Sequence, residues 1–202
     1  MEARAARVPF VGLTGGLGAG KSEALRALGE LGAATLSTDA VVHELLDTDE
    51  LRDALVERLG PEMAPGGRVD RSAVAERAFG EQEHRDWLEG LLWPRVGERV
   101  MSWRAEVDAA EPRPVAAVVE VPLLFEAGME NAFDHTLAVI AEESVREERA
   151  GARGHTAVAS RAGRQLPQAE KAERADFVVR NDGSLDELKE SLTSFLGTIG
   201  AA

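Results

Sequence analysis

The chain of 202 residues contains no cysteine and no tyrosine, and aromatic residues make up only 4% of it. Without cysteine there is no disulfide framework, no thiolate metal site and no cysteine nucleophile. The hydrophobic fraction is nevertheless 44%, so an aliphatic core can form and general disorder is excluded. The length corresponds to one domain, with room for a small inserted subdomain.

Positive charge is also scarce, because 23 Lys and Arg residues oppose 36 Asp and Glu residues and give a formal net charge of −13. This balance argues against sequence-independent binding of nucleic acid, which requires a basic surface, and against docking on anionic membranes. No apolar run reaches the ~18 residues that a membrane-spanning helix needs. The first seven residues lack the apolar centre of a signal peptide, so we expect a cytoplasmic protein.

Short apolar runs alternate with longer segments of helical periodicity. We expect strands over residues 9–13, 33–36, 115–121, 135–140 and 177–179. Nearly continuous apolar strands separated by helices indicate a mostly parallel sheet that is covered on both faces. We therefore predict an α/β fold with ligands at the carboxyl ends of the strands, and a loose tail over 197–202.

The stretch between the second and third expected strands, about 49–103, is mostly helical by pattern, with leucines at helical spacing. Helical insertions of this kind often cover the site of an α/β protein. They can also simply add core, and the sequence leaves both interpretations open.

The strongest motif is the run Gly-Gly-Leu-Gly-Ala-Gly-Lys-Ser from Gly15 to Ser22, which fits G-x-x-x-x-G-K-[ST] between a strand and a helix. Its glycines let the backbone turn tightly and direct several N–H groups at one anion, and the following helix adds the positive end of its dipole. Lys21 is expected to reach the outer phosphates of a nucleotide and the Ser22 hydroxyl to hold Mg²⁺. The expected nucleotide contacts here are Gly16, Gly18, Ala19, Gly20, Lys21 and Ser22.

The Asn-Lys-x-Asp and Asp-x-x-Gly strings of GTP-type switches are absent from the chain. A small-molecule kinase instead needs a base near the acceptor hydroxyl and cations over the transferred phosphoryl group. Asp39 follows the second expected strand and is the candidate base, although it would also suit the N-cap of a helix starting at Ala40. His43 lies one turn later on the same helical face and is either a phosphate contact or a surface residue.

Residues 146–165 form a basic segment of an acidic protein. Its arginines outnumber its two glutamates and are Arg146, Arg149, Arg153, Arg161 and Arg164. Guanidinium groups suit phosphate oxygens, so the segment is a candidate lid; the alternative is a solvated helical face with Glu–Arg pairs. Position favours a functional role for Arg153, which ends a helical run before Gly154.

These segments together resemble one family, the dephospho-CoA kinases, over nearly the whole chain. The residues that carry the resemblance include Gly12–Ser22, Thr38-Asp39-Ala40 with His43, Asp70-Arg71, Val121-Pro122-Leu-Leu-Phe-Glu126, and Asn181 with Gly183. In the lid they are Arg149, Arg153, Arg161 and Gln165, followed by Glu170-Lys171 and Ala175-Asp176. The resemblance implies transfer of the ATP γ-phosphoryl group to the ribose 3′-hydroxyl of dephospho-CoA, the last step of coenzyme A synthesis. It also implies a P-loop kinase fold with a five-stranded, mostly parallel sheet, and a monomer or weak homo-oligomer.

The resemblance assigns roles to particular positions. Asp39, Lys21 and Arg153 would be catalytic, and Ser22 with Asp39 would hold Mg²⁺. Asn181 and Gly183 would lie near adenine. The substrate side would comprise Asp39, His43, Arg71, Leu123, Leu124, Phe125, Glu126 and Arg161.

The resemblance also predicts three parts within one domain. Residues 8–45, 113–142 and 175–197 would form the nucleotide-binding core, 46–112 a helical CoA-side subdomain, and 143–174 the lid. The chain departs from the family pattern at Ser37, where an Asp is common, and at Trp93, where a His precedes the proline; Trp93 is alternatively helix core with Trp87 and Leu91. The remaining alternatives are another small-molecule kinase, of nucleoside or nucleotide type, or a catalytically weakened nucleotide-binding paralogue.

Overall fold

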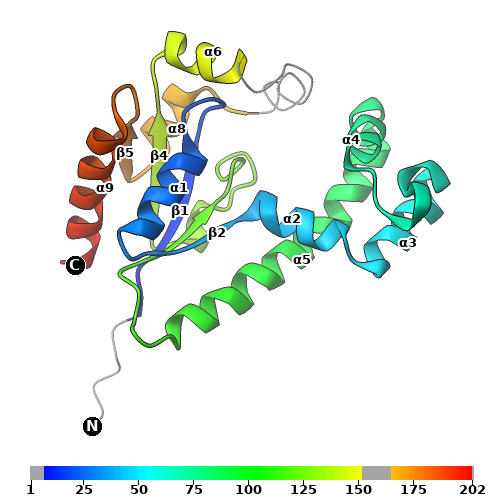
Figure 1. The fold of residues 1–202 in the computed structure, drawn as a ribbon, viewed down its shortest axis with the longest axis horizontal. Coiled ribbons are helices and arrows are strands. Elements are labelled where there is room, and N and C mark those ends of the chain that lie inside the picture. The colour runs from blue at the N-terminus through cyan, green and yellow to red at the C-terminus, as the bar shows by residue number, and fades with distance from the viewer. Residues whose placement is uncertain (1–6, 152–164, 202) are drawn as a thin grey trace. The chain divides into compact units, whose positions relative to one another are not determined.

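The computed structural model describes residues 7–151 and 165–201 (Figure 1). It divides into two compact units. Unit 1 comprises residues 1–37 and 104–202, and unit 2 comprises residues 38–103.

A five-stranded sheet forms the centre of unit 1, with strand order β2-β3-β1-β4-β5. All four pairings are parallel, which confirms the predicted α/β fold and sharpens "mostly parallel" to fully parallel. The strands are β1 (Phe10–Gly15), β2 (Ala34–Ser37), β3 (Ala117–Glu120), β4 (His135–Ile140) and β5 (Phe177–Arg180).

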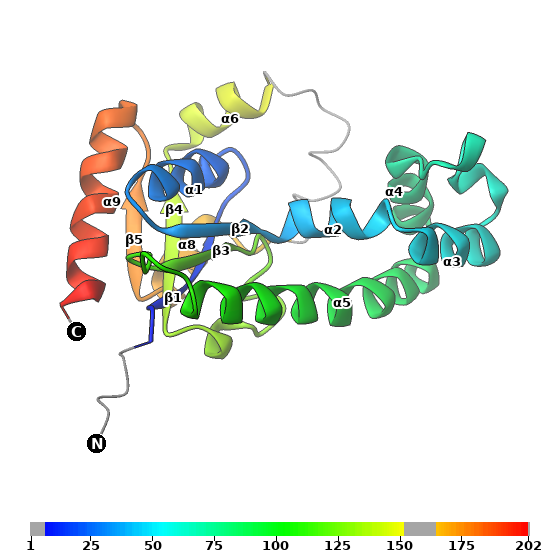
Figure 2. The ribbon, with the colours of Figure 1, turned by 60° about the horizontal axis from the view of Figure 1, so that its bottom comes forward.

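Helices cover the sheet because every residue of β1 and β3 is buried and both strands need apolar neighbours on each side. On one face α1 (Lys21–Glu30) packs against α9 (Leu185–Gly200), and α9 also runs along β5 (Figures 1 and 2). Their apolar residues share one core with β1 and β4, which includes Val11, Leu28, Leu137, Leu188 and Leu192. The short helix α8 (Gln168–Arg174) contacts β4 and β1, and α6 (Glu143–Gly151) follows β4.

The C-terminal helix corrects the expectation of a loose tail over 197–202, because α9 continues to Gly200 and residues 197–200 are helical. Ile199 is only 4% exposed and belongs to the core of the sheet, so the last turn is held by burial. The start of α9 is fixed by a capping box, in which Ser184 accepts from the Glu187 N–H and Glu187 accepts from the Ser184 N–H.

Unit 2 is helical and has a core of its own. Its leucines at helical spacing, among them Leu51, Leu55 and Leu59, are buried with Met63, Val74 and Leu92. Thr48 caps α3 and Asp70 caps α4 with their side-chain oxygens. The helices are α2 (Thr38–Leu46), α3 (Asp49–Leu59), α4 (Arg71–Gly80) and α5 (Gln82–Asp108), of which α5 continues into unit 1, and two short 3-10 turns lie at Pro61–Met63 and Pro65–Gly67.

Candidate active site

The loop between β1 and α1 is shaped as an anion cradle. The Lys21 ammonium donates to the Gly15 carbonyl at 3.1 Å and to the Gly16 carbonyl at 3.0 Å, so its side chain arches back over the loop. Gly20 occupies the N-cap of α1 and has no side chain with which to cap it. The N–H groups of the first turn therefore remain available to a phosphate, and the helix dipole favours negative charge there.

Two glycines of this loop are required by their surroundings. Gly18 has φ +75°, and a Cβ there would lie 2.6 Å from the Arg146 carbonyl oxygen. Gly20 has φ +91°, and its Cβ would lie 2.1 Å from the Asn181 amide nitrogen. Because the left-handed region and the close contacts coincide, any larger residue at either position would displace the loop or its neighbours.

Side chains from distant segments brace the outside of the loop. Arg146 of α6 donates from Nε to the Leu17 carbonyl at 2.9 Å, and Asn181 donates from Nδ2 to the Ala19 carbonyl at 2.9 Å. Arg149 donates to the Asn181 carbonyl at 2.9 Å, so it adds a further connection from α6. Asn181, expected near adenine, is 5% exposed, and its amide group contacts the loop backbone.

Gly183 lies beside the capping box of α9. A Cβ at Gly183 would lie 2.0 Å from the Glu187 Oε2 atom, so a larger residue there would move the Glu187 carboxylate, which takes part in the capping box of α9. The catalytic candidate Arg153 and the substrate candidate Arg161 lie outside the described residues. Of the expected lid over 143–174, the described helices are α6 and α8.

Two side chains with oxygen atoms that could bind a metal ion, Ser22 and Glu120, lie at the carboxyl edge of the sheet near this loop. Ser22 lies exposed in the first turn of α1. Glu120, which the sequence analysis missed, is 6% exposed at the end of β3, where its Cα pairs in register with Leu13 of β1 and Ser37 of β2. A carboxylate that ends an otherwise apolar strand run is the signal that would have indicated it.

The turn 122–128 after β3 was expected to wall the acceptor site. Leu124 is fully buried. It packs closely on Gly12 of β1, where an added Cβ would lie 2.5 Å from the Leu124 Cδ1 atom. Phe125 is 4% exposed, and the Arg174 guanidinium lies over its ring at 4.7 Å. The third apolar residue expected in this wall, Leu123, is partly exposed. The buried side chains of Leu124 and Phe125 therefore chiefly hold the turn in place.

The last residue of that expected wall, Glu126, faces Lys171, which belongs to the expected lid over 143–174 and to which the sequence analysis gave no role of its own. Lys171 of α8 is fully buried and lies 2.9 Å from Glu126 Oε1. Burial lowers the pKa of Lys171 below its ordinary value, while Glu126 opposes that shift. One signal was available, because the chain has only three lysines and one of them is Lys171.

In unit 2, α2 begins at Thr38 and contains Asp39 in its first turn. The alternative in which Asp39 caps a helix starting at Ala40 is therefore wrong. Arg71 at the start of α4 donates to the His43 carbonyl at 3.3 Å and pairs with Asp47 at 2.7 Å, so two expected substrate contacts, Arg71 and His43, lie together.

Trp93, which stands where the family pattern has a histidine before the proline, belongs to α5 in unit 2. Trp93 is 51% exposed, whereas Trp87 and Leu91 pack against the core of the unit. The alternative in which Trp93 is a core residue is therefore wrong.

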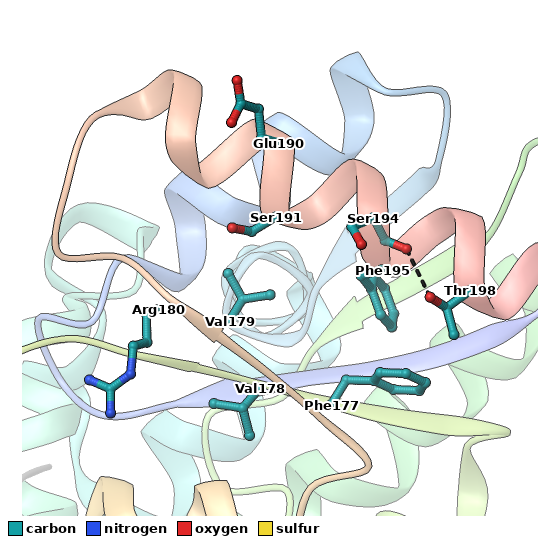
Figure 3. A pocket seen from close by; sticks show the side chains of 9 residues that line it. All are labelled: Phe177, Val178, Val179, Arg180, Glu190, Ser191, Ser194, Phe195 and Thr198. Atoms are coloured by element: carbon teal, nitrogen blue, oxygen red, sulfur yellow. Dashed lines mark hydrogen bonds between the residues drawn. The ribbon is translucent and has the colours of Figure 1, made fainter.

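Two shallow hollows lie elsewhere on unit 1. One of about 470 Å³ lies between β5 and α9, where Phe177, Arg180 and Phe195 line it (Figure 3). Another of about 390 Å³ is lined by residues at the end of β4 and on α8. Neither hollow is lined by a residue of the loop 15–22, so the candidate site rests on the cradle and not on a deep cavity.

The described residues contain neither a membrane-spanning helix nor a preformed metal cluster. None of the helices within 7–151 and 165–201 is long and apolar enough to cross a membrane. Over the same residues no group of three or more His, Asp or Glu side chains could hold a metal ion. A divalent cation at this site would therefore need further ligands from a bound phosphate.

Comparisons with known proteins agree with one another. The family model for dephospho-CoA kinase matches residues 9–187. A dephospho-CoA kinase of Protochlamydia amoebophila is 37% identical over 187 residues, which cover 90% of this chain and 92% of that protein. One from Deinococcus radiodurans is 36% identical, covering 92% of this chain and 90% of that protein.

Solved structures resemble the fold over nearly its full length. A protein from Thermus thermophilus matches with a TM-score of 0.79 and 32% identity, covering 96% of this chain and 99% of that one. A dephospho-CoA kinase from Campylobacter jejuni matches with a TM-score of 0.68 and 23% identity, covering 95% and 96%, and supports the fold alone.

Proposed function

The chain belongs to the dephospho-CoA kinase family and phosphorylates dephospho-CoA to coenzyme A, and we propose that the loop 15–22 and Asp39 carry this reaction. The loop binds the phosphates of ATP, and Asp39 acts on the ribose 3′-hydroxyl of the acceptor. The observation that carries the proposal is the cradle itself: an uncapped helix start at Gly20 and an ammonium folded back over the loop.

The charges of the loop suit a triphosphate. The Lys21 ammonium donates to the Gly15 and Gly16 carbonyls at the start of the loop. The N–H groups of the first turn of α1 lie at the positive end of the helix dipole. Phosphoryl transfer demands positioning and charge stabilisation more than covalent participation by the protein. We propose that Lys21 moves from the Gly15 and Gly16 carbonyls to the outer phosphates when ATP binds.

Mg²⁺ suits the side-chain oxygen atoms of Ser22 and Glu120 in unit 1, and the Asp39 carboxylate of unit 2 is a ligand of the same chemical kind. We propose that Ser22 and Asp39 hold the ion together with phosphate oxygens, and that Glu120 supports it from the end of β3. When bound, the ion would neutralise charge on the transferred phosphoryl group.

Asp39 is proposed as the group that orients the acceptor hydroxyl and accepts its proton. With Ser37 where the family often has an aspartate, Asp39 has no second carboxylate directly before it in the chain. Arg71 and His43, which lie together in unit 2, are proposed to contact anionic groups of the acceptor. Arg153 and Arg161 remain proposed phosphate and substrate contacts of the lid.

The test combines the purified chain with ATP, Mg²⁺ and dephospho-CoA and detects the product by mass, with its phosphate position assigned by NMR. The variant Asp39→Asn should bind ATP as before and turn over ~10²-fold or more slowly, because it cannot accept the proton. Asp49→Asn, which alters an exposed carboxylate in the first turn of α3, is the matched control and should react normally.

A near-normal rate for Asp39→Asn would remove Asp39 from this role. Transfer to a nucleoside in place of dephospho-CoA would instead indicate another small-molecule kinase, and ATP binding without any transfer would indicate a weakened paralogue.

A further inference from the structure

Lys171 joins three separate segments of unit 1 at one buried point. Its ammonium donates to the Pro122 carbonyl at 2.6 Å and to the Thr14 hydroxyl at 3.4 Å, and it pairs with Glu126 at 2.9 Å. Thr14 immediately precedes Gly15, where the phosphate loop begins, while Pro122 and Glu126 belong to the turn 122–128. The three donors of one ammonium thus connect the root of the loop to two residues of the turn, Pro122 and Glu126.

Stability alone does not call for a charge at this position. Lys171 is fully buried and the Glu126 side chain is 13% exposed, so both groups lose most of their hydration. Replacing a buried ion pair by apolar residues of similar volume is often neutral or stabilising, whereas removing one partner is strongly destabilising. What an ion pair adds over an apolar pair is direction, because its hydrogen bonds fix the partners in one arrangement.

Glu126 carries the connection one step further. Its Oε1 atom also accepts a hydrogen bond from the Leu166 N–H at 2.8 Å, near the beginning of the described segment that leads into α8. Its Oε2 atom is buried and has no hydrogen-bond partner among the described residues. The carboxylate therefore ties the turn to the chain before α8 while Lys171 ties both to Thr14.

We propose that Lys171, acting through Glu126 and Pro122, is a positioning residue that holds the acceptor-side turn 122–128 in register with the root of the phosphate loop. The inference rests on the proposed role of this turn beside the acceptor. Displacement of a bound substrate by about 1 Å can lower a transfer rate ~10²-fold. The pair therefore acts on the alignment of the acceptor with the phosphoryl group and not on the affinity for ATP.

The test uses the full chain with both charges removed together, as Lys171→Met with Glu126→Gln, so that no unpaired charge stays buried. Matched control substitutions are Lys189→Met with Glu30→Gln, which remove a Lys–Glu pair of 2.8 Å at the surface of the same unit. The measurements are thermal unfolding, ATP affinity by titration without acceptor, and kcat and KM for dephospho-CoA.

The double variant at 171 and 126 should keep its ATP affinity within ~3-fold and lose ~10- to 100-fold in kcat/KM for dephospho-CoA. The surface control should change neither quantity. A double variant that unfolds cooperatively, binds ATP and retains kcat/KM within ~3-fold of the wild type would overturn the inference.

If the double variant fails to fold, the single variant Glu126→Gln is tested in its place, because its amide oxygen can still accept a hydrogen bond from Lys171. A reduced kcat with unchanged ATP affinity in that variant supports the positioning role, and an unchanged kcat overturns it. Failure of the proposed function is separate, because the wild-type chain would then form no coenzyme A at all.

Discussion

Substitution of Gly20 by alanine tests whether the phosphate loop is held by its neighbours as the structure shows. Gly20 has φ +91°, and the new Cβ would lie 2.1 Å from the Asn181 amide nitrogen. Gly32, just past the other end of the same helix, has φ +93°, and a Cβ there meets only Val115 at 3.9 Å. Gly20→Ala and Gly32→Ala therefore share the backbone strain and differ in the clash.

The expected magnitudes separate the two variants. The left-handed conformation costs an alanine about 1–2 kcal/mol at either position. At Gly20 the Asn181 side chain must also move, which breaks its buried 2.9 Å hydrogen bond to the Ala19 carbonyl and costs a further ~1–3 kcal/mol. We expect Gly20→Ala to lose about 2–5 kcal/mol in free energy of unfolding and Gly32→Ala about 1–2 kcal/mol.

Urea unfolding gives the stability, and titration with ATP gives the affinity. Gly20→Ala should weaken ATP binding at least ~10-fold because the first N–H groups of α1 shift, whereas Gly32→Ala should leave it within ~2-fold. Adding Asn181→Ala removes the clashing amide, so Gly20→Ala should cost less in that background than in the wild type. Equal effects of the two glycine variants, or no relief from Asn181→Ala, would show that the contact with Asn181 does not hold the loop.

Two lysines give the remaining predictions. Lys21→Ala should weaken ATP binding and lower kcat together, while Lys189→Ala on α9 should do neither; unchanged kinetics in Lys21→Ala would remove the loop from the proposed mechanism. Burial lowers the pKa of Lys171 below 10.5, so the unfolded chain binds more protons at that residue than the folded one between the two pKa values. Stability relative to Lys171→Met should therefore rise as pH rises towards 10.5, measured by urea unfolding, and a fall over that range would contradict the burial of the charge.

The sheet was predictable because its strands are short apolar runs that local patterning reveals. The expected strand over 135–140 coincides with β4, while the expected run 115–121 shortens to Ala117–Glu120. Val115 is 50% exposed and lies before the ladder, so its apolar character did not reflect burial. The tail was misjudged because Gly197 suggests a helix end, whereas burial of Ile199 two residues later carries the helix on.

The candidate site was predictable only where it is contiguous in sequence. The loop 15–22 is one uninterrupted motif, and its glycines and lysine specify the cradle directly. The braces are different, because Arg146 reaches Leu17 across 129 residues and Asn181 reaches Ala19 across 162. Such pairs depend on which strands become neighbours and in what register, and no local periodicity in one sequence records that.

The use of lysine in so arginine-rich a chain adds a physical argument for Lys171. The site around it offers three oxygens, which matches the three donors of an ammonium, whereas a guanidinium brings five donors in a fixed plane. Arg104 illustrates the difficulty, since it is 2% exposed and its Nη1 atom has no partner among the described residues. Each further unsatisfied buried donor costs about 1–3 kcal/mol, so arginine at position 171 would be destabilising even where its volume fits. Lys171 and Lys21 both contact the segment Thr14–Gly16, and both are positions where a compact charge is required by the geometry.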